Sequence, residues 1–141
     1  MPPKAKFAAT ACFATTVLTV VYWVLFFFVP GTVQSSSDTC YLIFERSFPA
    51  ADAWMIFCTL LAGLALLRQR RNSLLWGLLG GGSMIYLGCM DVLCDLENGV
   101  YAHFTADVAT EIVINLLVLT FGPWLVIWFW RQRAVLLALP A

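Results

Sequence analysis

The chain contains few charged residues. Only 11% of its 141 residues are Asp, Glu, Lys or Arg, and the net charge is zero, whereas about 25% of the residues in a soluble domain are charged. Hydrophobic residues make up 62% of the chain. This composition excludes an ordinary soluble globular protein and indicates a surface that faces lipid. It also gives no support for nucleic-acid binding, which depends on clustered positive charge.

The chain also lacks the motifs that identify most enzymes and cofactor proteins. His103 is the only histidine, no two cysteines have C-x-x-C spacing, and neither G-x-S-x-G nor H-E-x-x-H occurs. These absences exclude haem ligation by membrane histidines, a dithiol redox site and the common hydrolase motifs. The sequence therefore leaves open whether a cofactor or a metal binds.

Four long hydrophobic segments dominate the chain, at about 7–29, 50–67, 74–94 and 106–130. Each has roughly the 17–25 residues that cross a hydrocarbon core of about 30 Å. Backbone polar groups cannot remain unbonded in lipid, so these segments should be helices. The sequence predicts one all-α integral membrane domain over residues 1–141, built as a four-transmembrane-helix bundle. The first segment is about twice as long as the core of a signal peptide, so we expect it to be retained.

Basic residues give the expected orientation. In a four-helix topology seven of the eight fall on one side, and only Arg46 falls on the other. The positive-inside rule then predicts a multi-pass protein of the cell membrane with both termini and the Arg68–Arg71 loop in the cytoplasm. The seven residues are Lys4, Lys6, Arg68, Arg70, Arg71, Arg131 and Arg133.

Glycines mark the faces by which the third and fourth segments should pack. Gly77, Gly81 and Gly88 are spaced by four and seven residues, so they lie on one side of a helix. Glycine at such spacing allows close helix approach in membranes. Gly122 lies seven residues after Asn115 and shares its face in the fourth segment. We expect these two faces to point into the bundle.

Polar residues gather at the outer ends of the same faces. Ionisable residues in membrane helices are costly and suggest function by default. Arg46 is the only cation there, and its planar guanidinium suits pairing with Asp91, Asp95 or Glu111. The candidate ligand-binding residues are Glu45, Arg46, Asp52, Asp91, Asp95, Tyr101, Glu111 and Asn115, with His103 in the loop above them.

Two cysteines on the outer side form a candidate disulfide. Cys40 lies in the first outer loop and Cys94 at the outer end of the third segment. Disulfides persist on the oxidising side of a membrane, so we predict that these two can pair. Cys12, Cys58 and Cys89 are expected to be free.

Three functions remain open from the sequence. The first is an outward-facing acidic pocket that binds or transports a cation or an amine-bearing ligand. The second is an accessory or structural subunit of a larger membrane complex, or a homo-oligomer, since short-looped helices with glycine faces suit such packing. The third is an intramembrane enzyme with paired carboxylates as acid and base, although an enzyme is the less favoured class. The lipid bilayer is a partner in each case.

Overall fold

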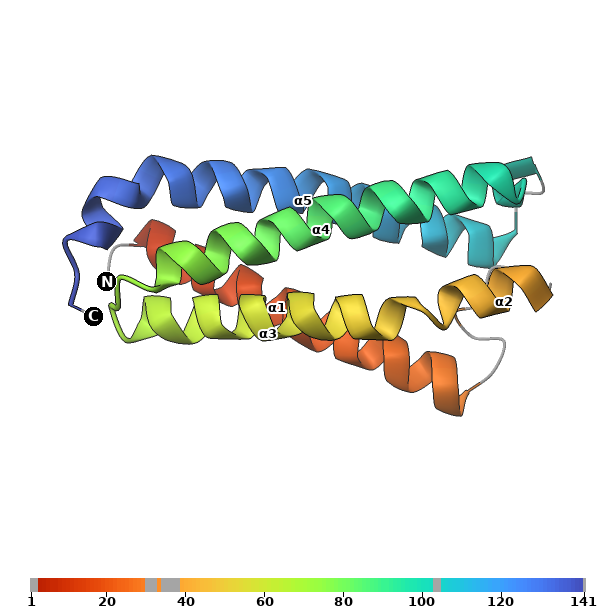
Figure 1. Ribbon diagram of the computed structural model, residues 1–141, viewed down its shortest axis with the longest axis horizontal. Coiled ribbons are helices and arrows are strands. Elements are labelled where there is room, and N and C mark those ends of the chain that lie inside the picture. Colours follow the sequence, from red (N-terminus) through yellow and green to blue (C-terminus); the bar gives the residue numbers. More distant parts are fainter. Residues whose placement is uncertain (1–2, 30–32, 34–38, 103–104, 141) are drawn as a thin grey trace.

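The computed structural model describes residues 3–29, 33, 39–102 and 105–140, and this part of the chain is helical (Figure 1). Four of its helices are long and apolar enough to cross a membrane. The prediction of an all-helical chain with four membrane-length helices is therefore confirmed. The elements are α1 (Pro3–Phe28), α2 (Thr39–Glu45), α3 (Phe48–Leu67), α4 (Ser73–Glu97), η1 (Val100–Ala102) and α5 (Ala106–Leu137).

The helix ends follow from local chemistry. A proline stands in the first turn of α3, where its missing N–H leaves no bond unmade. Gln69 and Gly99 have positive φ angles, of 51° and 63°, in the turns that follow α3 and α4. Thr105 caps α5, because its hydroxyl accepts a hydrogen bond from the Val108 amide at 3.2 Å. Pro123 lies inside α5, which continues to Leu137, beyond the expected end near residue 130. The short helix α2 was not expected.

The four long helices pack in a row. α1 packs along α3, α3 along α4, and α4 along α5. The row curves, so that α1 and α5 form its two edges and diverge from each other toward α2 (Figure 1). Both termini lie at one end of the bundle (Figure 1). There the Arg71 amide donates to the Pro140 carbonyl at 2.9 Å and ties the α3–α4 turn to the end of α5.

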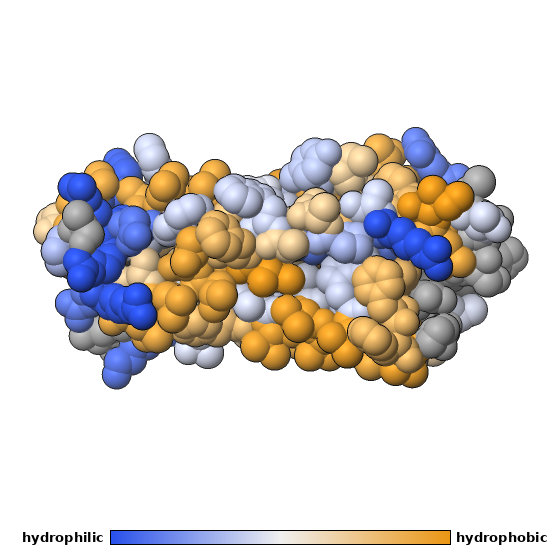
Figure 2. All heavy atoms as spheres, turned by 60° about the horizontal axis from the view of Figure 1, so that its bottom comes forward, coloured by the Kyte–Doolittle hydropathy of each residue, from blue (hydrophilic) through white to orange (hydrophobic). Residues whose placement is uncertain are grey.

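The two ends of the bundle differ in charge. We call the end with the chain termini the basic end, because Arg68, Arg70, Arg71, Arg131 and Arg133 lie there. The opposite end, where α2 and η1 lie, is the acidic end. Hydrophilic side chains gather at the basic end in Figure 2, and apolar side chains cover most of the length between the two ends. This distribution suits a helix bundle surrounded by lipid.

The glycines of α4 and α5 allow these two helices to approach closely. A β-carbon on Gly77 would lie 2.2 Å from the ring of Phe129, which is fully buried. A β-carbon on Gly81 would lie 3.0 Å from the carbonyl oxygen of Gly122, and one on Gly122 would lie 3.1 Å from the carbonyl oxygen of Gly81. Gly88 lies similarly against Leu119. This contact fixes the rotation of α4 and α5, and with it the direction of the polar residues further along both helices.

Candidate functional site

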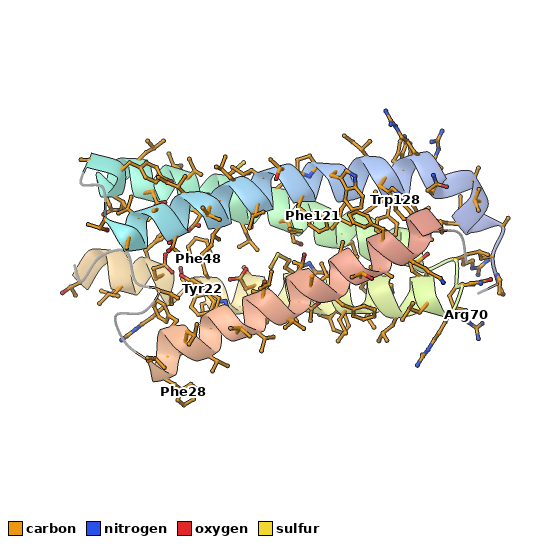
Figure 3. The ribbon with its side chains drawn as sticks, turned by 180° about the vertical axis from the view of Figure 1, so that it is seen from behind. Tyr22, Phe28, Phe48, Arg70, Phe121 and Trp128 are labelled. Atoms are coloured by element: carbon orange, nitrogen blue, oxygen red, sulfur yellow. The ribbon has the colours of Figure 1, made fainter. Side chains whose placement is uncertain are left out.

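A cavity of about 840 Å³ lies inside the curve of the row, between α1 and α5. Its walls come from α1, α3, α4 and α5, with Glu45 contributed by α2. Figure 3 looks onto this side of the molecule, with Tyr22, Phe48 and Phe121 labelled around the gap between α1 and α5. Apart from three threonines, the polar residues of the lining lie toward the acidic end and are Tyr22, Trp23, Glu45, Asp52, Asp91, Glu111 and Asn115.

Three carboxyl groups of three helices meet at the acidic end of the cavity. Asp91 of α4 shares a hydrogen bond with Glu111 of α5, and Glu45 of α2 is close enough to repel the charge on Asp91. Glu45 and Glu111 are 4% and 3% exposed. A hydrogen bond between two carboxyl groups requires a proton on one of them. Like charges held close together cannot all be ionised cheaply, so a proton shared by Asp91 and Glu111 lowers the repulsion within the group.

A second group of polar residues lies next to the first and consists of Asp95, Tyr101 and Asn115. The hydroxyl of Tyr101 donates to Asp95 Oδ2 at 2.7 Å, and Asn115 Nδ2 donates to the same oxygen at 3.2 Å. Asp95 is only 1% exposed, so these two donors replace water around its carboxylate. Burial and the bond to Asp95 raise the pKa of Tyr101 above its ordinary value. Tyr101 therefore remains a donor over the whole physiological pH range.

Asn115 has an unused acceptor. Its Nδ2 bonds to Asp95 and contacts the Tyr101 hydroxyl at 3.4 Å, but its Oδ1 has no partner within the described structure. The residue is 4% exposed and lines the cavity. A buried carbonyl oxygen without a partner is unfavourable by about 1–3 kcal/mol.

Two aromatic residues of α1 contact the acids and were missed by the reasoning from sequence. Trp23 Nε1 donates to Asp52 Oδ2 at 2.8 Å, and the Tyr22 hydroxyl donates to Glu45 Oε2 at 3.5 Å. The available signal was their position well inside a membrane-length helix. A Trp N–H or Tyr O–H in such a place usually has a hydrogen-bond partner.

Arg46 follows Glu45 directly in the chain but differs from it in exposure. Its side chain is exposed just after α2, and it forms no ion pair among the described residues. Within the described structure, Asp52 and Asp95 accept hydrogen bonds from Trp, Tyr and Asn side chains, and Asp91 lies beside other acids. Among the described residues, the expected pairing of Arg46 with the buried carboxylates is therefore not observed.

The remaining sequence-based predictions concern the cysteines and His103. Cys94 is buried, and Asn98 Nδ2 contacts its sulfur at 3.3 Å. The side chain of Cys40 lies outside the described residues, so its pairing with Cys94 stays a prediction. Cys12, Cys58 and Cys89 are free in the structure. His103 also lies outside the described part of the chain.

Within the described residues no three His, Cys, Asp or Glu side chains are arranged to hold a metal ion. No known protein family, curated protein or solved structure matches this chain.

Proposed function

We propose that the protein binds a cation or an amine-bearing ligand in the cavity, as a receptor or a transporter. One observation carries this proposal. The carboxyl groups of Asp91 and Glu111 share a hydrogen bond beside Glu45, on the wall of a cavity of about 840 Å³.

The charge around this group favours a cation. Glu45 and Glu111 are buried, Asp52 lines the same cavity, and the Arg46 side chain is exposed. Buried carboxyl groups that lie close together lower their free energy by taking up protons or a cation. A cationic ligand would meet several acceptors at once, and charge-assisted hydrogen bonds are the stronger kind.

The orientation is part of the same proposal. The basic end carries five arginines, so we place it in the cytoplasm and the acidic end outside. The acidic end of the cavity would then be reached from the outer side of the membrane or from its outer leaflet.

The test is ligand-dependent thermal stability in detergent. Candidate cations and amines should stabilise the wild type, by about 2.7 kcal/mol at a ligand concentration 100 times the Kd. Glu111→Gln and Asp91→Asn should abolish that stabilisation and leave the ligand-free protein as stable or more stable, because each removes like-charge repulsion. Glu97→Gln is the matched control, since Glu97 is an exposed acid at the end of α4.

Two results would contradict the proposal. If no cation or amine stabilises the wild type, the cavity has another role. If Glu111→Gln instead lowers stability by about 3–5 kcal/mol, Glu111 is one partner of a buried ion pair and its role is structural. Stoichiometric co-purification of another membrane protein after mild extraction, with no ligand response, would favour the accessory-subunit function instead.

A further inference from the structure

The acidic residues of the cavity lie toward one end only. Its carboxylates and Asn115 lie toward the acidic end, while Met55, Met84 and Trp124 line it farther toward the basic end. On α1 the lining extends from Phe7 to Leu25, positions that are about 27 Å apart along a helix axis. This distance is close to the thickness of a hydrocarbon core, about 30 Å. A small hydrated cation would leave most of such a cavity without contacts.

The cavity is also open sideways. α1 and α5 are the two edges of the helix row, and both contribute to the lining. Leu18 on α1 and Leu117 on α5 line the cavity and are 64% and 57% exposed. In the view of Figure 3 the gap between α1 and α5 faces the reader. Since this side of the bundle lies against lipid tails in a membrane, an apolar molecule can enter the cavity without crossing water.

The polar end of the cavity is rich in hydrogen-bond acceptors. Asn115 Oδ1 is a buried acceptor without a partner in the described structure, and Asp91, Glu111 and Glu45 are further acceptors beside the cavity. A primary ammonium has three donors and no acceptor, so it can serve Asn115 and two carboxylates together. A phosphate group at the same place would face the carboxylates as a like charge. This excludes phospholipid headgroups, including those that carry an amine.

We propose that the ligand is a long-chain primary amine, with its ammonium group among Asp91, Glu111 and Asn115 and its apolar chain along the cavity between α1 and α5. This rests on the proposed function and specifies its ligand class. The chain enters from the lipid through the opening between the two edge helices. A quaternary ammonium, which has no N–H, would leave the Asn115 acceptor without a partner and bind less well.

The test is binding of radiolabelled dodecylamine to the full chain in phosphatidylcholine nanodiscs. Unlabelled dodecylamine should displace the label. At equal aqueous concentrations, propylamine should compete more than about 1,000-fold less well, because each methylene moved out of water, into the bilayer or the cavity, raises affinity about fourfold. Dodecanol, which has the same chain and partitions into the same bilayer, should compete at least about tenfold less well because it lacks the charged donor. Replacing half of the lipid by phosphatidylethanolamine should not displace the label.

Variants separate the chain from the headgroup. Thr15→Trp fills the apolar part of the cavity and should abolish dodecylamine binding, while Val17→Trp is the matched control, since Val17 is exposed on the same helix outside the lining. Leu18→Trp serves in place of Thr15→Trp if that variant does not fold. Asn115→Leu should weaken dodecylamine binding by about tenfold or more.

The outcomes distinguish this inference from the proposed function. If propylamine binds as tightly as dodecylamine and Thr15→Trp has no effect, the acidic end binds amines but the long-chain ligand is wrong. If dodecanol or phosphatidylethanolamine displaces the label as well as dodecylamine does, the headgroup assignment is wrong. If neither amine binds and Glu111→Gln changes nothing, both proposals fail.

Discussion

Replacing Gly77 by alanine tests the contact that fixes α4 against α5. The added β-carbon would lie 2.2 Å from one atom of the Phe129 ring and 2.3 and 2.4 Å from two others. These distances are far inside van der Waals contact, and Phe129 is 0% exposed, so the ring has no solvent-exposed place to move into. Either the ring or the backbone of one helix must shift.

The magnitude follows from two opposing terms. Overpacking of a close-packed site is unfavourable by about 1–3 kcal/mol, and this clash lies at the upper end because the ring is rigid and fully buried. Alanine favours a helix over glycine by about 1 kcal/mol. We therefore expect Gly77→Ala to lower the free energy of unfolding by about 1–2 kcal/mol. Gly82→Ala is the matched control, because a β-carbon there meets nothing within 4 Å, and it should be neutral or stabilising.

The assay is equilibrium unfolding in detergent of the wild type and both glycine variants, with Phe129→Leu and the double variant Gly77→Ala/Phe129→Leu. The double variant should recover part of the loss, giving a coupling energy of about 0.5–3 kcal/mol as expected for residues in contact. If Gly77→Ala is as stable as Gly82→Ala, or if the coupling is zero, the close approach of α4 and α5 at this point is wrong. The cavity geometry that depends on their rotation would then need revision.

Three further predictions concern Tyr101, Trp23 and the orientation in the membrane. Tyr101→Phe should lower stability by about 1.5–3 kcal/mol, because the bond to the buried Asp95 is lost. Since folding raises the pKa of Tyr101, wild-type stability should also fall as the pH rises above about 10, and the variant should lack that part of the fall in denaturation measured across pH. Trp23→Phe removes the donor to Asp52 and should lower the unfolding free energy by about 1 kcal/mol in the same assay. A reporter active only outside the cytoplasm should be silent when fused after Ala141, and its activity would reverse the proposed orientation.

The sequence determined the features that depend on neighbouring residues. Hydrophobic runs of membrane length predict helices, because lipid offers no hydrogen-bond partners to backbone N–H and C=O groups. Helical periodicity places Gly77, Gly81 and Gly88 on one face whatever that face meets. It likewise places Asp91 and Asp95 on that face near the end of the same helix. The seven-residue helix α2 escaped prediction, because an element so short gives no periodic signal that separates it from a loop.

The tertiary structure decided which polar groups meet. The rotation of α4 against α5 brings Asp91 to Glu111, and Asp95 to Asn115, and this rotation is set by the side chains that the glycines contact on the opposite helix. No spacing along the chain contains that information, because it depends on atoms of two helices at once. The divergence of α1 from α5 likewise opens the cavity. Each helix can be predicted from its own residues, whereas the cavity between the helices depends on how several of them pack together.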